Sequence, residues 1–226
     1  MRISASLAVK IPNRLRPPLR VALRTYLWIY GNIALKSPLK LFKVAKLKKY
    51  DSLKLNVGCG KAKFPGWVNI DIEPGADLVM DVRKRLPFDD NSVDFIYNEH
   101  FLEHITFEGG EKVLREFRRC LKKRGVLRIA MPDLNFIIQQ YDKEFKNEDW
   151  FPAGYEFVET KGMAINMAFR WWGHKYLYNE EDLGNQLIKA GFQKIKRCEW
   201  NKSNHPELSN LETRKESRLI VEAKKE

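Results

Sequence analysis

The fold is decided by residues 53–60, Leu-Lys-Leu-Asn-Val-Gly-Cys-Gly, where a short apolar run ends in two glycines separated by one residue. Glycine has no Cβ, so such a turn lets the backbone bend sharply and approach a ligand closely. The next two apolar runs, residues 68–71 and 79–81, each end in an aspartate. An acid at the end of the strand after a glycine turn can bind ribose hydroxyls. The three runs together predict a nucleotide-type site at the ends of neighbouring strands.

The spacing argues against a dinucleotide site. In the Gly-x-Gly-x-x-Gly pattern of such sites, the third glycine would fall at Lys63, and the acid would follow by roughly 20 residues. Asp71 comes much sooner. The sequence therefore does not predict a helix N-terminus that holds a pyrophosphate.

The order of these features resembles the start of the class I S-adenosylmethionine-dependent methyltransferases, in their small-molecule (type 11-like) branch. In that family an apolar strand is followed by an acid, one residue and Gly-x-Gly, which residues 53–60 resemble. Asp71 matches the acid that binds the ribose after the second strand. Asp81 and Val82 match the pair that contacts the adenine after the third strand. The resemblance implies S-adenosylmethionine as the cofactor.

Later segments continue the resemblance in the same order. Residues 86–88, Leu-Pro-Phe, match a stretch before the family's fourth strand, and residues 102–104, Leu-Glu-His, match a segment after it. Residues 123–125, Lys-Arg-Gly, match the turn before the fifth strand. The resemblance covers residues 53–134 well and residues 177–224 more weakly.

The sequence departs from the family pattern at three points. Asn56 replaces the usual acid, and Ala62 replaces the last glycine. Residues 61–67 and 72–78 are too few for the first two crossover helices, since a parallel crossover usually needs a dozen or more residues. We therefore expect loops in place of both helices. The alternative is a degenerate, empty cofactor site, although Asn56 can still form hydrogen bonds.

The resemblance and the strand ends together predict the cofactor contacts. These are Asn56, Gly58, Cys59, Gly60, Asp71, Ile72, Asp81, Val82, Asn98 and Glu99. No metal is expected, because the three cysteines are widely spaced and form no Cys-x-x-Cys pair. The same spacing favours a reducing compartment without disulfides.

The pattern of apolar runs predicts an α/β fold with a Rossmann-like, seven-stranded, mostly parallel sheet. Five runs are short and bounded by Gly, Pro or Asp, as buried parallel strands should be. They lie at residues 53–57, 67–72, 78–80, 93–98 and 126–131. Helices are expected at 111–121 and from Asn179, where a capping residue precedes three acids. A final antiparallel hairpin is expected from residues 194–200 and 218–223.

Charge divides the chain of 226 residues into two parts. Residues 1–50 hold twelve Lys or Arg and no acid. In residues 51–226 the basic and acidic residues, 29 of each, cancel. We therefore predict a basic, helical N-terminal arm at 1–50 and a methyltransferase-like domain at 51–226.

Three hypotheses account for the arm. Basic residues beside aromatic and aliphatic ones suit a helix that lies on an anionic membrane surface. The arm could instead pack on the domain or on a second subunit, or bind RNA. Its uncharged run, residues 25–35, is too short to span a bilayer, and arginines interrupt any signal-peptide core. The expected location is cytoplasmic, with docking at the inner face of the membrane as the first hypothesis.

Residues 134–176 do not fit the sheet pattern and are expected to form the substrate region. The segment is rich in aromatic residues, and an insertion after the fifth strand would form a wall of the site. The alternative is a helical pair whose aromatic side chains form a local core. Arg170, Trp171 and His174 are the residues of this segment for which we predict a functional role.

Four residues are candidates for acid–base chemistry: His100, His104, Asp133 and His174. A methyl transfer needs a base only if the acceptor must lose a proton. His100 and His104 are four residues apart and would share one helical face. Their order with Glu103 is not the His-Glu-x-x-His of zincins. Each has a structural alternative, which for Asp133 is capping the helix that follows it.

The function predicted is methylation by S-adenosylmethionine of a small-molecule, sugar or glycan acceptor, on oxygen, at the membrane surface. Residues 98–101, Asn-Glu-His-Phe, lack the Pro-Pro-aromatic motif of amino-methylating enzymes that act on adenine. Cys120 and Cys198 are expected in a helix and a strand, not as nucleophiles. One alternative is an RNA methyltransferase that uses the basic arm. The other is a non-catalytic binding module with a methyltransferase-like fold.

Overall fold

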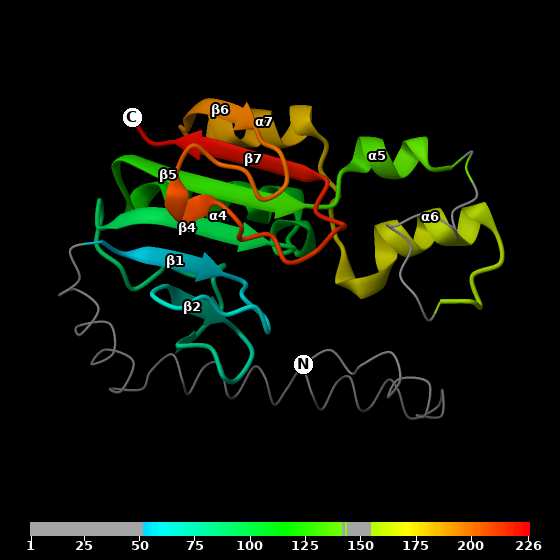
Figure 1. Cartoon of the computed structure of the whole chain (residues 1–226), viewed down its shortest axis with the longest axis horizontal. Helices are drawn as coiled ribbons and strands as arrows, with labels where there is room; N and C mark the ends of the chain where they lie inside the picture. Colours follow the sequence, from blue (N-terminus) through cyan, green and yellow to red (C-terminus); the bar gives the residue numbers. More distant parts are fainter. Residues whose placement is uncertain (1–51, 142, 144–154) are drawn as a thin grey trace.

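The computed structural model describes residues 52–141, 143 and 155–226 (Figure 1). The predictions for the N-terminal arm, residues 1–50, fall outside these residues, as does the middle of the aromatic-rich insertion. Within the described part, no helix is long and apolar enough to cross a bilayer.

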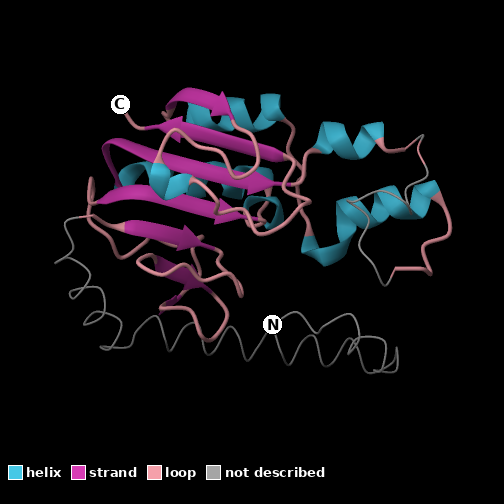
Figure 2. Ribbon diagram, viewed as in Figure 1, coloured by secondary structure: helices cyan, strands magenta, loops and turns pink. Residues whose placement is uncertain are grey.

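The described strands form one seven-stranded sheet in the order β3-β2-β1-β4-β5-β7-β6 (Figure 2). The strands are β1 Lys54–Val57, β2 Val68–Asp71, β3 Leu78–Val79, β4 Val93–Glu99, β5 Leu121–Met131, β6 Gln193–Arg197 and β7 Leu219–Lys224. The pairs among β1 to β5 are parallel, and β7 is antiparallel to both of its neighbours. The predicted sheet and its antiparallel last hairpin are confirmed.

Four α-helices and three short 3-10 turns accompany the sheet in the described residues. They are α4 Phe107–Cys120, α5 Leu134–Gln139, α6 Lys161–Arg170, α7 Glu180–Lys189, η2 Leu102–His104, η4 Trp171–Gly173 and η5 Pro206–Leu208. The hydroxyl of Thr106 caps α4, which therefore begins before the predicted residue 111. Asn179 caps α7 by accepting from the Asp182 amide at 2.8 Å, as predicted.

The main core lies between the sheet and the pair α4 and α7. Helix α4 buries Val113, Leu114 and Phe117 against the strands, which is the face that its 3- and 4-residue spacing predicts. On the other face of the sheet, a smaller cluster includes Trp67 and Leu208 and is covered by loops. One face is therefore helical and the other is closed by connecting segments.

Loops replace both early crossover helices, as the sequence predicted. Residues 58–67 and 72–77 contain no helix, and a buried amide connects them. The Asn69 Oδ1 atom accepts from Asn56 Nδ2 at 3.0 Å and from the Phe64 amide at 2.9 Å. The Nδ2 atom of Asn69 donates to Asp77 Oδ2 at 2.7 Å. These hydrogen bonds give the buried side chains of Asn56 and Asn69 their partners and hold the two loops in place.

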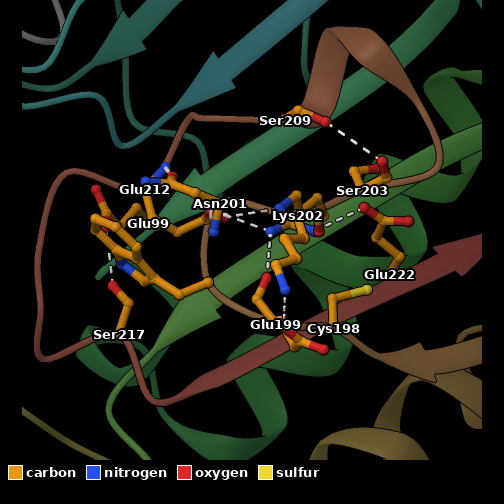
Figure 3. A network of polar contacts seen from close by, with 12 residues as sticks. Glu99, Cys198, Glu199, Asn201, Lys202, Ser203, Ser209, Glu212, Ser217 and Glu222 are labelled. Carbon is orange, nitrogen blue, oxygen red and sulfur yellow. Dashed lines mark hydrogen bonds and ion pairs between the residues drawn. The ribbon is translucent and has the colours of Figure 1, made fainter.

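A buried ion cluster fastens the loop between β6 and β7 to the sheet. Arg128 of β5 is fully buried and donates to carboxylate oxygens of Glu212 and Glu222, both at 2.7 Å. Glu212 also accepts from the Asn201 amide at 2.8 Å (Figure 3). Removing one partner of such a cluster leaves an uncompensated buried charge, which is strongly destabilising. The loop is therefore a fixed part of the domain.

The aromatic-rich insertion lies beyond the carboxyl ends of β4 and β5. Figure 1 shows α5 and α6 past the arrowheads of these strands. A separate apolar cluster holds the two helices together and includes Ile137, Ala164 and Met167. The insertion therefore has its own small core at the end of the sheet where ligands bind in open α/β folds.

Candidate functional site

The glycine turn after β1 is tied to the end of β2. The amides of Gly58 and Cys59 both donate to the Ile70 carbonyl, at 2.8 and 3.1 Å. The Gly60 amide donates to Asp71 Oδ2 at 2.8 Å. The two predicted cofactor-binding segments are thus brought together into one rigid corner.

The two glycines of the turn serve different purposes. Gly58 has a φ of +71°, and a Cβ placed on it would lie 2.8 Å from the Phe101 Cβ. Gly58 therefore makes room for Phe101, which follows β4. Gly60 has a φ of +50°, and a Cβ there would meet no atom within 4 Å. Gly60 therefore borders open space, as a glycine beside a ligand should.

Asp71 and Ile72 lie at the edge of this open space. The Oδ1 atom of Asp71 accepts from the Glu73 amide at 2.8 Å, and Oδ2 accepts from Gly60. Each carboxylate oxygen has a second acceptor site, so Asp71 keeps the capacity to accept two ribose hydroxyls. Ile72 is exposed, and its side chain is accessible to an adenosine group.

Asp81 is engaged by a neighbouring arginine. Arg83 donates from Nε to Asp81 Oδ1 at 2.8 Å and from Nη2 to Oδ2 at 2.7 Å. Burial alone would raise the pKa of Asp81, but the hydrogen bonds and charge of Arg83 outweigh it and lower that pKa. Val82 is buried in the main core. An adenine that contacts the Asp81 carboxylate would therefore compete with Arg83 for its oxygens.

Asn56 is buried and its amide is committed to the loops. It donates to the Ala62 carbonyl at 2.7 Å and to Asn69 Oδ1 at 3.0 Å. Both acceptors require an amide donor at position 56, and an aspartate would offer none. The amide at position 56 thus has a structural role in the described loops, which an aspartate could not fill.

Asn98 and Glu99, the last two predicted cofactor contacts, differ in their hydrogen bonds. Asn98 is fully buried, and its amide atoms have no hydrogen-bond partner among the described residues. Glu99 instead holds the loop before β7. Its carboxylate accepts from the amides of Thr213 and Arg214 and from the Ser217 hydroxyl (Figure 3). Glu99 therefore fixes a loop, a role that the sequence analysis did not identify.

A cavity of about 190 Å³ opens beside the end of β5. Its lining combines rings, apolar groups and charged groups from the segments after β4 and β5, the insertion and the loop that Glu99 holds. The lining residues are His100, Pro132, Asp133, Phe136, Ile137, Tyr155, Ala168, Trp172, His174, Arg214 and Glu216. Three of the four predicted catalytic residues thus share one cavity. His104 is not among the lining residues, although its ring centroid lies 5.0 Å from that of His174.

His100 and His104 do not share a helical face, so that expectation was wrong. The His100 amide still pairs with the Ala130 carbonyl of β5, and the residue has a φ of +49°. His100 therefore precedes the short turn η2 and is not part of a helix. Both rings instead approach Glu103. The His100 Nδ1 atom lies 3.4 Å from Glu103 Oε1, and His104 Nε2 lies 3.8 Å from it. Glu103 is fully buried, and the sequence analysis had not selected it.

Asp133 is engaged on both oxygens. It caps α5 by accepting from the Asn135 amide at 3.0 Å, and it pairs with Arg197 at 2.8 Å. The capping alternative is therefore confirmed. Asp133 thus lines the cavity while both of its carboxylate oxygens are already engaged by protein groups.

The aromatic side chains of the insertion form both a local core and a cavity wall. Trp172 lines the cavity and donates from Nε1 to the Tyr155 hydroxyl at 3.0 Å. Trp171 is 41% exposed and stacks on Phe157, away from the lining. Of the three residues predicted in this segment, only His174 reaches the cavity. The sequence analysis chose Trp171 as a functional residue and missed Trp172. The φ of +58° at Trp172 turns the chain there, and nothing in the sequence indicates this turn.

The described cysteines are not poised for nucleophilic chemistry. Burial and the charges of Asp71 and Asp77 raise the pKa of Cys59 to about 12. Burial raises the pKa of Cys120, in α4, to about 12 as well. A thiol with such a pKa stays protonated at neutral pH and is inert. Cys59 therefore contributes to the glycine turn through its backbone.

Residues 55–129 match a family model whose description is "methyltransferase domain". No curated protein sequence matches the chain. The matched residues run from β1 to β5 and so contain the glycine turn, Asp71, Asp81 and the two histidines after β4. The family resemblance predicted from the sequence is confirmed.

Several solved structures are similar to the chain. A candidate O-methyltransferase from Nostoc punctiforme is 10% identical, with a TM-score of 0.50, over 86% of this chain and 56% of that one. A SAM-dependent methyltransferase from Archaeoglobus fulgidus is 16% identical over 88% and 100% of the two chains, with a TM-score of 0.48. Another from Thermotoga maritima is 17% identical over 94% and 98%, with a TM-score of 0.47. The first of these likenesses, at 10% identity, supports the fold alone.

Proposed function

We propose that the chain is an S-adenosylmethionine-dependent methyltransferase whose acceptor is a sugar or glycan methylated on oxygen, in line with its methyltransferase domain at residues 55–129. The observation that carries the proposal is the cavity of about 190 Å³ that His100 lines, one residue before the Phe101 ring that packs on Gly58. Phe101 packs on Gly58, and its neighbour His100 lines the cavity. The segment after β4 therefore links the place for the cofactor with the place for an acceptor.

The residues present fit the adenosine end of the cofactor. Open space beside Gly60 admits the ligand, and Asp71 retains acceptor sites for ribose hydroxyls. Ile72 would cover the adenine. The cofactor supplies a methyl group on a sulfonium, so the protein mainly has to hold the acceptor oxygen in line with it. Such positioning contributes about 7–11 kcal/mol in well-oriented cases.

The cavity lining suits a ring that bears hydroxyl groups. Trp172, Tyr155 and Phe136 offer flat apolar faces, while Arg214 and Glu216 offer a donor and an acceptor. We assign His100 as the base. When bound, the cofactor would supply its methyl group to the acceptor oxygen and would leave as S-adenosylhomocysteine. His100 would accept the proton that the hydroxyl loses.

Residues 1–50 are proposed to dock the enzyme on an anionic membrane surface, where lipid-linked glycans are found. The charge of this segment supports the proposal, since it holds twelve basic residues and no acid. Comparing the full chain with a chain that lacks residues 1–50 on anionic and neutral liposomes tests it. Equal binding by both chains would contradict membrane docking.

Methyl transfer from labelled cofactor to a panel of sugars, lipid-linked glycans and RNA tests the acceptor class. We expect label in a saccharide and a loss of transfer in Trp172→Ala. Trp171→Ala is the matched control, because that ring lies outside the cavity lining. Label in RNA alone would instead support an RNA methyltransferase. Failure to bind the cofactor would support a binding module.

A further inference from the structure

We propose that Glu103, His104 and His174 form a binding site for a divalent transition-metal ion. One ligand atom from each of these residues lies within 4.8 Å of the other two. Glu103 and His104 belong to η2, and His174 follows η4, so the site joins the domain to the insertion. The sequence analysis predicted no metal from the spacing of the cysteines, and it did not connect His174 with His104, which lies seventy residues earlier.

Backbone hydrogen bonds hold the two segments in register. The amides of Lys175 and Tyr176 both donate to the Glu103 carbonyl, at 2.8 and 3.2 Å. Gly173 has a φ of +87°, which other residues rarely adopt, and so lets the chain turn beside His104. The three ligand groups are thus placed by the fold and would need little rearrangement to bind an ion.

The orientation of His174 matches that of a metal ligand. Its Nδ1 atom lies 2.6 Å from the Ala168 carbonyl oxygen. A carbonyl only accepts, so Nδ1 is the donor, and in the neutral ring Nε2 carries the lone pair that a metal would need. Metal-binding histidines usually donate their other ring N–H to a carbonyl or carboxylate in this way, which fixes tautomer and ring direction.

Two imidazoles and one carboxylate suit Zn²⁺, Co²⁺ or another first-row ion better than Mg²⁺, which prefers oxygen ligands. Bonds of about 2.0–2.1 Å place ligand atoms about 3.3 Å apart in a tetrahedral site. Side-chain shifts of about an ångström would close the present cluster to that size. The ion would keep open positions, and His174 places it at the wall of the cavity.

Metal binding tests the proposal independently of methyl transfer. Full-length protein without an affinity tag is stripped with a chelator, dialysed against CoCl₂ or ZnCl₂, and desalted. Bound metal per chain is measured by mass spectrometry, and Co²⁺ also by its visible absorption. We expect one ion per chain, weaker binding of Mg²⁺, and Co²⁺ bands typical of four or five ligands.

Three variants decide the assignment. Glu103→Gln and His174→Asn should each weaken Co²⁺ binding by at least about tenfold, in line with the loss of a ligand or its support. His205→Asn is the matched control, because this histidine lies against Phe95 on the other face of the sheet. Asparagine at 174 keeps a donor for the Ala168 carbonyl, so this variant decides the matter if Glu103→Gln fails to fold. Wild-type protein without bound metal, or folded variants that bind it as wild type does, would overturn the proposal.

Discussion

The side-chain amide of Asn56 donates to the side-chain oxygen of Asn69 at 3.0 Å, inside the corner where two crossover helices are absent. Asn69 in turn donates to Asp77 at 2.7 Å. This chain of buried hydrogen bonds connects β1, β2 and the loop before β3. The residue that departs from the family's motif therefore takes part in holding the loops that stand in place of the helices.

Asn56→Asp should destabilise the domain by about 1–3 kcal/mol, because it removes the donor and places a buried carboxylate against two acceptors. Chemical denaturation measures the free energy of unfolding. Asn185→Asp, on the exposed face of α7, is the control and should stay within about 0.5 kcal/mol of wild type. Equal stability of Asn56→Asp and the control would contradict the role of this amide.

Gly58→Ala and Gly60→Ala should separate folding from cofactor binding. A methyl group at Gly58 meets Phe101 at 2.8 Å, so this variant should lose several degrees of melting temperature. A methyl group at Gly60 meets no protein atom, so that variant should melt closer to wild type but bind S-adenosylhomocysteine at least about tenfold more weakly. Thermal melting and calorimetric titration measure the two effects. Unchanged affinity in Gly60→Ala would place the cofactor elsewhere.

Glu99→Gln should loosen the loop that carries Arg214. The carboxylate accepts from two amides and two hydroxyls in this loop, and hydrogen bonds to a charged group contribute about 1.5–3 kcal/mol. Hydrogen exchange of residues 213–217 should become faster, and the KM for the acceptor should rise more than that for the cofactor. The control is Glu199→Gln, whose exposed carboxylate pairs with Lys202. A rise in the cofactor KM alone would argue that Glu99 contacts the cofactor.

Acid should weaken the attachment of α4 to the segment before β4. Burial would raise the pKa of Glu116, but hydrogen bonds from Arg119 and from the Leu86 amide outweigh it and lower that pKa below 4.5. A carboxyl with a lowered folded-state pKa stabilises the fold above its unfolded value and loses this contribution as pH falls through the folded value. Stability should therefore fall below about pH 4.5 more steeply in wild type than in Glu116→Gln. Parallel pH curves for the two proteins would contradict this account.

The sheet could be predicted from the sequence because its strands are short apolar runs bounded by Gly, Pro and Asp. The caps at Asn179 and Asp133 were also predictable, since capping depends on local sequence. The left-handed backbone of His100 was not, because it follows from pairing with β5. The four-residue spacing of His100 and His104 favours a helix, but the hydrogen bond from His100 to Ala130 of β5 keeps His100 out of one. This pairing cannot be read from the sequence.

The candidate site was predicted in part for a similar reason. His100, Asp133 and His174 share the cavity, as a site at the ends of parallel strands requires. Glu103 was missed because Leu-Glu-His looked like a family motif and gave no sign that the acid is buried between two rings. Arg214 was missed because a distant carboxylate, that of Glu99, brings its loop to the cavity.

Calorimetric titration of the full chain with S-adenosylhomocysteine, beside Asp71→Ala and the exposed control Glu207→Ala, tests the central claim most directly. Asp71 joins the glycine turn through the Gly60 amide and retains acceptor sites for the ribose. We predict micromolar binding by wild type and Glu207→Ala and its loss in a folded Asp71→Ala. No heat from folded wild-type protein, or equal binding by Asp71→Ala, would contradict a cofactor site at this corner.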